Sequence, residues 1–219
     1  MQKNLCFLNK IFPKYSWFRL SGIVVLQALC YKGTSMLSKN WQHYTVELPI
    51  DSYIPFIPAF ILPYVLCYAH WVINIIMSAH TGRERFNKFS TALMLSQIIC
   101  GILFLVVPTT IVRPDVSMYK GVVGVLLKFI YGMDAPVNLF PSMHCLLSWF
   151  SWIAVRNCDN VPRWYQIFSL IFAIIVCIST VTVKQHFFVD IIGGVVLAET
   201  CWQLCNRLIN NVKTMEMKK

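Results

Sequence analysis

The chain has 219 residues, of which 57% are hydrophobic and 13% are charged, and its formal net charge is +10. An ordinary soluble domain carries about 25% charged residues, so this composition argues against a water-soluble fold and indicates a membrane protein. The positive charge does not indicate a nucleic-acid partner, because the Lys and Arg residues lie in short connectors between apolar runs and form no basic stripe.

Six apolar segments are candidates for membrane-spanning helices, each of which needs about 20 mainly apolar residues. They cover residues 17–37, 53–77, 90–112, 139–155, 164–183 and 187–209. The sequence therefore predicts an all-α fold, a polytopic membrane bundle of about six transmembrane helices that forms one domain at residues 17–211. We expect a basic cytoplasmic segment before it, residues 1–16, and a basic cytoplasmic tail after it, residues 212–219.

The segments outside these runs show no sign of a second domain. Residues 39–50 mix polar and aromatic side chains, so we expect an interfacial segment there and not a seventh span. No small-residue cleavage site follows the first apolar run, which predicts an uncleaved anchor. The nine cysteines lie mostly in apolar stretches and lack CxxC spacing, so neither a disulfide framework nor a metal site is expected.

The distribution of Lys and Arg predicts the orientation of the bundle. With the N-terminus in the cytoplasm, thirteen of these residues fall on the inner side and six on the outer side, as the positive-inside rule requires. This orientation places Arg113, residues 138–144 and residues 184–190 together at the outer ends of the spans. Three polar clusters that are distant in sequence then share one membrane face, although the spans were assigned from hydropathy alone, and this convergence indicates a site.

The first polar cluster is the sequence NLFPSMH, from Asn138 to His144. Pro141 suits the first turn of a helix, and the backbone N–H groups from Ser142 to His144 are then expected to point outward. Free N–H groups and the positive end of the helix dipole bind anions such as phosphate. The Ser142 hydroxyl would add a donor, and His144 could exchange a proton with the bound group. A plain helix start with an interfacial histidine fits the same pattern.

The second cluster is the sequence KQHFFVD, from Lys184 to Asp190. His186 and Asp190 are four residues apart and are therefore expected on one face of a helix. The carboxylate would hold one imidazole nitrogen and leave the other free to attack an electrophile. Gly193 and Gly194 follow, which predicts close packing of this helix on a neighbour. A structural hydrogen bond between helix turns would also explain the His–Asp pair.

The third cluster contains Arg113, at the end of the third predicted span. Its planar guanidinium suits a phosphate, although an arginine at this position is also a common interfacial anchor. His43 and His80 show no partner spacing, and His70 is expected to be interfacial or to face the bundle. Glu199, within the last predicted span, is expected to face the bundle and bond to a neighbour.

The order of these motifs resembles a known family. FPSMH is followed by SxxxxxxHxxxD, which comprises Ser179, His186 and Asp190. This arrangement is similar to the type 2 phosphatidic acid phosphatase superfamily, which contains lipid phosphate phosphatases, related acid phosphatases and haloperoxidases, and the sphingolipid synthases that transfer phospho-headgroups. The resemblance covers residues 108–199, and the six-span layout extends it over the whole chain.

The resemblance implies a role for each residue of the predicted site. His186 looks like the nucleophile that forms a phosphohistidine, and Asp190 looks like its orienting carboxylate. His144 resembles the general acid that protonates the leaving alkoxide and later activates the acceptor. Ser142 and the adjacent backbone resemble the phosphate cradle. No metal and no organic cofactor is implied.

The chain departs from the family pattern at two cations. The first motif, KxxxxxxRP, is present only as Arg113-Pro114, because Val106 stands where the lysine would be. Thr180 stands where an arginine usually follows the serine of the third motif. Lys184 is the best replacement for one of them, and the weaker candidates are Lys120 and Lys128. Such trimming is similar to the branch of inositol phosphorylceramide and sphingomyelin synthases, and also to many bacterial members.

The resemblance implies an integral membrane phosphatase in the cell membrane, with its active site on the extracytoplasmic face. It would hydrolyse a lipid phosphate or diphosphate through a phosphohistidine, and its partners would be this substrate and membrane lipids, with no nucleic acid. The alternative is a phosphotransferase that passes a phospho-headgroup to a lipid or sugar alcohol. A second alternative is a non-catalytic transporter or scaffold that keeps the bundle. The sequence does not decide between water and an alcohol as the acceptor.

Overall fold

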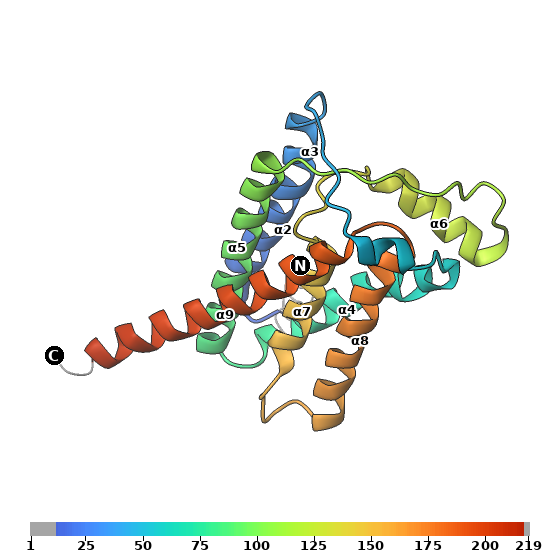
Figure 1. Cartoon of the computed structure of the whole chain (residues 1–219). Coiled ribbons are helices and arrows are strands. Elements are labelled where there is room, and N and C mark those ends of the chain that lie inside the picture. The colour runs from blue at the N-terminus through green and yellow to red at the C-terminus, as the bar shows by residue number, and fades with distance from the viewer. Residues whose placement is uncertain (1–11, 217–219) are drawn as a thin grey trace, which may run out of the picture.

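The computed structural model describes the backbone of residues 12–216 and the side chains of residues 12–210. Most of the expected basic segment at residues 1–16 and of the basic tail at residues 212–219 lies outside the described side chains. The described part of the chain is all-helical, as predicted (Figure 1). Its α-helices are α2 (Trp17–Ala28), α3 (Thr34–Leu37), α4 (Ile61–Ala79), α5 (Arg83–Val106), α6 (Gly121–Met133), α7 (Met143–Val155), α8 (Arg163–Thr182) and α9 (Phe188–Glu216).

Short helical turns extend or connect these helices. They are the 3-10 turns η1 (Lys14–Ser16), η3 (Pro49–Tyr53) and η4 (Pro58–Phe60) and a π-helical turn labelled η2 (Leu29–Gly33), which joins α2 to α3. Five helical segments are then long and apolar enough to cross a membrane: Lys14–Leu37, Pro58–Ala79, Arg83–Val106, Arg163–Thr182 and Phe188–Asn210. The prediction of a polytopic membrane bundle is confirmed. The third span ends at Val106 and not at residue 112, so Arg113 lies in the loop that follows it.

The fourth predicted span, residues 139–155, is shorter than expected because its helix, α7, begins only at Met143. A helix of 13 residues is about 20 Å long, whereas the hydrocarbon core of a bilayer is about 30 Å thick. All of its residues except Trp149 and Trp152 are buried, and it packs against α4, α8 and α9. The helix lies inside the protein, where neighbouring helices surround it. It therefore does not need the length of a lipid-exposed span.

No span is predicted at residues 121–133, yet these residues form α6. This helix lies to one side of the bundle (Figure 1), and its buried residues Gly124, Leu127 and Ile130 form one face. Leu127 and Ile130 belong to the same apolar cluster as Ile61 and Tyr64 of α4. Thirteen residues fall below the length of a span, which is why hydropathy alone leaves α6 as a loop.

An ion pair joins the C-terminal end of α7 to α9. Arg156 Nη2 donates to Glu199 Oε2 over 2.9 Å, and Arg156 Nη1 bonds to Oε1. Trp149 Nε1 donates to the same Oε1 over 2.8 Å. The prediction that Glu199 faces the bundle and bonds a neighbour is therefore confirmed. His70 also faces the bundle, since it is buried and its Nε2 lies 3.0 Å from Ser169 Oγ.

Candidate functional site

The N-terminal ends of α7 and α9 meet inside the bundle. The backbone N–H of Ser142 donates to the backbone carbonyl oxygen of Asp190 over 3.1 Å. A Cβ on Gly194 would lie 2.6 Å from the Ser142 carbonyl oxygen, and one on Gly193 would lie 2.7 Å from the ring of Phe140. The close packing predicted at these two glycines is confirmed. It brings the residues after Ser142 and those before Asp190 to one place.

His186 and Asp190 form the predicted imidazole–carboxylate pair. His186 Nδ1 lies 3.2 Å from Asp190 Oδ2, which also accepts a 2.9 Å bond from the Phe187 N–H. The prediction that both residues lie on one helix face is wrong, because α9 begins at Phe188. The pair forms because the Asp190 carboxylate turns back over the start of its own helix. With Nδ1 held by Asp190, Nε2 is the ring nitrogen of His186 that does not contact this carboxylate.

His144 lies in the first turn of α7 and faces His186. The centroids of the two imidazole rings are 6.0 Å apart. Tyr64 stacks on the His144 ring with centroids 4.4 Å apart, and its hydroxyl lies 3.3 Å from Nδ1. The Tyr68 hydroxyl lies 3.2 Å from Nε2. These tyrosines hold the ring in place, and sequence reasoning missed both because they come from α4, which is remote in the chain and carries no spacing signal.

Ser142 caps α7 and leaves fewer free N–H groups than predicted. Its N–H donates to the Asp190 carbonyl, so the prediction that this group points toward an anion is wrong. Its hydroxyl accepts a 3.3 Å bond from the Cys145 N–H, as helix-capping serines do. The N–H groups of Met143 and His144 belong to the first turn, where intrahelical partners are lacking, and they remain for a bound anion.

Arg113 and Lys184 lie on the His186 side of the imidazole pair. Together with His186 they line a cavity of about 450 Å³. Arg113 Nη1 donates to the Asp134 carbonyl over 2.7 Å, and Lys184 Nζ donates to the Ile54 carbonyl over 2.6 Å. Burial lowers the pKa of Arg113, but a guanidinium is so strongly basic that it keeps its charge at neutral pH. The Arg113 guanidinium and the Lys184 ammonium therefore border this cavity, whose lining also includes the carboxylates of Glu47 and Asp51.

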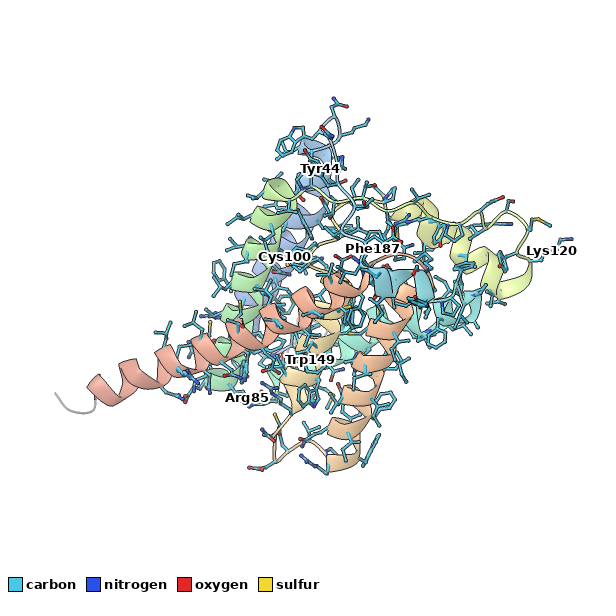
Figure 2. The ribbon with its side chains drawn as sticks, viewed as in Figure 1. Tyr44, Arg85, Cys100, Lys120, Trp149 and Phe187 are labelled. Atoms are coloured by element: carbon cyan, nitrogen blue, oxygen red, sulfur yellow. The ribbon has the colours of Figure 1, made fainter. Side chains whose placement is uncertain are left out.

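The other two candidate cations lie elsewhere. Lys120 and Lys128 are exposed, and neither lines the cavity that contains His186. Figure 2 shows Lys120 at the outer tip of the α6 segment, well away from Phe187, the residue next to His186. Of the three lysines considered as replacements for the missing family cations, Lys184 alone lines the cavity.

A family model of the PAP2 superfamily matches residues 40–204, which is more than half of the chain. The chain belongs to the PAP2 superfamily. Comparison with curated proteins and with solved structures gave no match. Membership supports a phosphatase-like phosphoesterase or a related lipid-modifying function, and the five long apolar helices are those of a membrane protein.

Asp51 is a further residue of the candidate site that sequence reasoning missed, after Tyr64 and Tyr68. Its Oδ1 accepts a 2.7 Å bond from the Phe188 N–H at the start of α9, and its Oδ2 accepts a 2.8 Å bond from the Leu48 N–H. A carboxylate at a helix N-terminus is stabilised by the helix dipole. Asp51 thus fixes the helix start that follows His186, but nothing in its local sequence signals a contact with a residue so distant in the chain.

Asp134 is the fourth residue that was missed, and it lines a separate cavity. It is buried, directly after α6, and its Oδ1 accepts a 3.3 Å bond from the Tyr31 hydroxyl. The cavity is about 170 Å³ and contains His144 in its lining, but not His186. The PAP2 site of this chain therefore has one cavity on the His186 side and a smaller one on the His144 side.

Proposed function

We propose that this PAP2 protein is an integral membrane lipid phosphatase that cleaves a lipid phosphate or diphosphate through a phosphohistidine on His186. Asp190 orients the nucleophile, and His144 is the general acid and base. Arg113, Lys184, Ser142 and the first-turn N–H groups of α7 surround the phosphoryl oxygens. The mechanism needs neither a metal nor an organic cofactor, because phosphoryl transfer requires mainly in-line positioning and stabilisation of charge on the non-bridging oxygens.

The single observation that supports this proposal most strongly is the distance between the two imidazoles. Reacting atoms in a productive complex lie about 3 to 3.5 Å apart. The centroids of the His144 and His186 rings are separated by 6.0 Å, so both rings can contact the same phosphoryl group. Asp190 Oδ2 contacts the His186 ring, and two tyrosine hydroxyls lie within 3.3 Å of the His144 ring nitrogens, so both rings are held in place.

The reaction then takes two steps. His186 Nε2 forms a bond to phosphorus, and the bond from phosphorus to the leaving oxygen breaks; that oxygen keeps the electron pair and takes a proton from His144. In the second step the acceptor oxygen attacks phosphorus and loses its proton to His144. The phosphorus–nitrogen bond breaks, and its electron pair returns to His186. Asp190 stabilises the positive charge that develops on the His186 ring during the first step.

We also propose that the site faces the extracytoplasmic side of the cell membrane. The bundle end opposite the site carries Arg83 and Arg85 at the start of α5, Arg156 after α7 and Arg163 at the start of α8. Figure 2 shows Arg85 toward the opposite end of the molecule from Tyr44. Cytoplasmic connectors carry an excess of such residues. Cysteine labelling from outside the cell, with the cysteine introduced at Lys120, tests this orientation.

The experiment that tests the activity uses the purified protein in nanodiscs. Radiolabelled phosphatidic acid, phosphatidylglycerol phosphate and polyprenyl diphosphate are offered in turn, and both inorganic phosphate and acid-labile, alkali-stable label on the protein are measured. We expect His186→Ala to abolish both signals and Asp190→Ala to reduce them sharply. His43→Ala is the matched control, since His43 lines neither cavity.

The same experiment separates the enzyme from a non-catalytic scaffold. A wild-type protein that releases no phosphate and takes up no label from any of the three lipids contradicts the proposal. Loss of activity accompanied by loss of folded protein, seen as aggregation of His186→Ala in size-exclusion chromatography, would assign a structural role to the pair instead.

A further inference from the structure

The buried carboxyl group of Asp134 has an oxygen that the protein leaves without a partner. The side chain is 5% exposed, and its Oδ2 has no hydrogen-bond partner among the described residues. Leaving a buried acceptor unpaired costs about 1 to 3 kcal/mol, so such a group calls for an explanation. The backbone of Asp134 is fully used, since its N–H donates to Ile130 and its carbonyl accepts from Arg113.

This carboxyl group shares its cavity with His144. The cavity lies between α2, α4 and α7, and its remaining lining is mostly apolar. The lining residues that matter here are Trp71, Met143 and Leu147, which offer apolar surface, and Tyr68 and Lys32, which add polar groups. Ligand sites in proteins typically combine such apolar walls with a few placed polar groups. A single water occupies about 30 Å³ of liquid, whereas this cavity measures about 170 Å³.

The position of the cavity indicates which part of the substrate it would hold. The cations Arg113 and Lys184 lie in the other cavity, on the His186 side, which suits the phosphoryl oxygens. The oxygen that leaves phosphorus must lie on the His144 side, where it receives its proton. Any group attached to that oxygen then extends into the smaller cavity, beside Asp134.

We propose that the His144-side cavity is the binding site of a lipid alcohol, and that Asp134 Oδ2 accepts the hydrogen bond of its hydroxyl. This inference rests on the proposed function. The alcohol is the product of the first step and can also serve as the acceptor in the second. In that direction the hydroxyl hydrogen turns from Asp134 Oδ2 to His144, and the hydroxyl oxygen forms the bond to phosphorus as its proton passes to His144. The phosphorus–nitrogen bond breaks, and its electron pair returns to His186.

The apolar walls favour a lipid alcohol over a water-soluble one. Gln27 lines the cavity from α2, which belongs to a candidate span, and Leu147 lines it from the shorter apolar helix α7, which packs against spans α4, α8 and α9. An acyl chain attached to the hydroxyl carbon can therefore lie against Leu147 and Trp71 while the hydroxyl reaches Asp134. A free sugar alcohol would leave these walls in contact with its polar groups, at a cost in free energy.

The test measures how the phosphoenzyme divides its phosphoryl group between two acceptors. Full-length protein in nanodiscs is loaded with labelled 4-nitrophenyl phosphate, whose leaving group carries no lipid chain. Dioctanoylglycerol is then added, and transfer to it is compared with release of inorganic phosphate. Asp134→Asn is expected to lower the ratio of transfer to hydrolysis about tenfold, because a charge-assisted hydrogen bond becomes a neutral one. Phosphoenzyme formation is measured in the same samples, and transfer is expressed per phosphoenzyme formed.

A second variant tests the cavity without altering the carboxyl group. Leu147→Phe fills the space that the acyl chain would use, so it is also expected to lower the transfer ratio while phosphate release continues. Asp115→Asn is the matched control, since Asp115 is exposed in the loop before α6 and bonds only to Ser117 among the described residues. It should leave the ratio unchanged.

Each outcome decides the question. An unchanged ratio in both cavity variants overturns the inference, and so does a loss of phosphoenzyme formation that matches the loss of transfer, because it would show a structural role for Asp134. Phosphoenzyme formation in the wild type without any transfer to dioctanoylglycerol overturns the inference alone. A wild type that forms no phosphohistidine overturns the proposed function itself, and the inference with it.

Discussion

The backbone N–H of Ser142 and the backbone carbonyl of Asp190 are joined by a 3.1 Å hydrogen bond, which fixes the start of α7 to the start of α9. This contact determines the geometry of the site, because each imidazole lies within a few residues of it. His144 follows Ser142, and His186 precedes Asp190. A change in the packing of these two helix starts must therefore alter the separation of the rings.

Gly194 provides the most direct test of this packing. A Cβ at this position would lie 2.6 Å from the Ser142 carbonyl oxygen, a backbone atom that cannot move without shifting α7. We expect Gly194→Ala to lower both the melting temperature and the turnover, with a loss of stability of about 1 to 3 kcal/mol from overpacking.

Gly132→Ala on α6 is the matched control. A Cβ there meets nothing within 4 Å, so the substitution should keep activity and leave stability unchanged or raised by about 0.5 to 1 kcal/mol. Differential scanning fluorimetry and a phosphate-release assay measure both effects. Equal behaviour of the two variants would show that the α7–α9 contact does not control the site.

His144→Ala should reveal its role through the leaving group. A general acid contributes about 10² to 10⁴ in rate when the departing oxygen needs a proton. We expect a loss of this size for a lipid phosphate, whose alkoxide is a poor leaving group. The loss should be much smaller for 4-nitrophenyl phosphate, because its phenolate departs without protonation.

The measurement for His144→Ala is the ratio of turnover numbers for these two substrates, compared with the same ratio in wild type. His43→Ala serves as the control and should keep the wild-type ratio. If His144→Ala slows both substrates equally, the residue acts by holding the structure and not by donating a proton.

The ion pair between Arg156 and Glu199 should support stability and not chemistry. The two side chains are 17% and 25% exposed, so the pair is shielded but not isolated from water. Glu199→Gln leaves the guanidinium without its charged partner, and we expect a loss of about 1 to 3 kcal/mol. Turnover per folded molecule should stay at the wild-type level, because the pair lies at the opposite end of α7 from His144.

Thermal unfolding followed by size-exclusion chromatography measures the effect of Glu199→Gln. Asp159→Asn is the control, since it removes an exposed carboxylate from the same end of the bundle. A wild-type melting temperature for Glu199→Gln would mean that the pair contributes nothing measurable to stability. Many exposed ion pairs behave in this way.

Much of the site was predictable because its residues lie in short sequence motifs that can be recognised without knowledge of the fold. His186 and Asp190 are close in sequence, and their pairing depends on one helix start. Ser142 and His144 follow a proline at the beginning of an apolar run. Local spacing also predicted the all-α bundle, because hydropathy over about 20 residues detects a span without knowledge of its neighbours.

The missed features depend on contacts between distant segments. Tyr64 and Tyr68 reach His144 from α4, and no spacing in the sequence relates them to it. Asp134 looks like a loop residue after a short apolar run, and only the fold places it beside His144. The sequence also predicted that α7 begins too early, at residue 139 and not at Met143. At the true helix start the Ser142 N–H donates to the Asp190 carbonyl, a contact between distant segments.

The pH dependence of the transfer ratio should follow Asp134. Burial raises the pKa of its carboxyl group above the ordinary value of 3.8. The charges of Lys32, Arg113 and His186 and the hydrogen bond that the Tyr31 hydroxyl donates to the carboxylate oppose this increase. Above the raised pKa the carboxylate accepts a hydrogen bond from the alcohol. As the pH falls through that pKa the group takes up a proton and this acceptor is lost, so transfer to dioctanoylglycerol should fall relative to hydrolysis. His144 and His186 act on both products, which share one phosphoenzyme, so a change at either residue largely cancels in the ratio. The ratio is measured between pH 4 and pH 8. This range extends about two units on either side of 6 and covers the ordinary titration of carboxyl groups and imidazoles. Asp134→Asn should give a flat profile, and a profile that keeps its slope in this variant would assign the titration to another group.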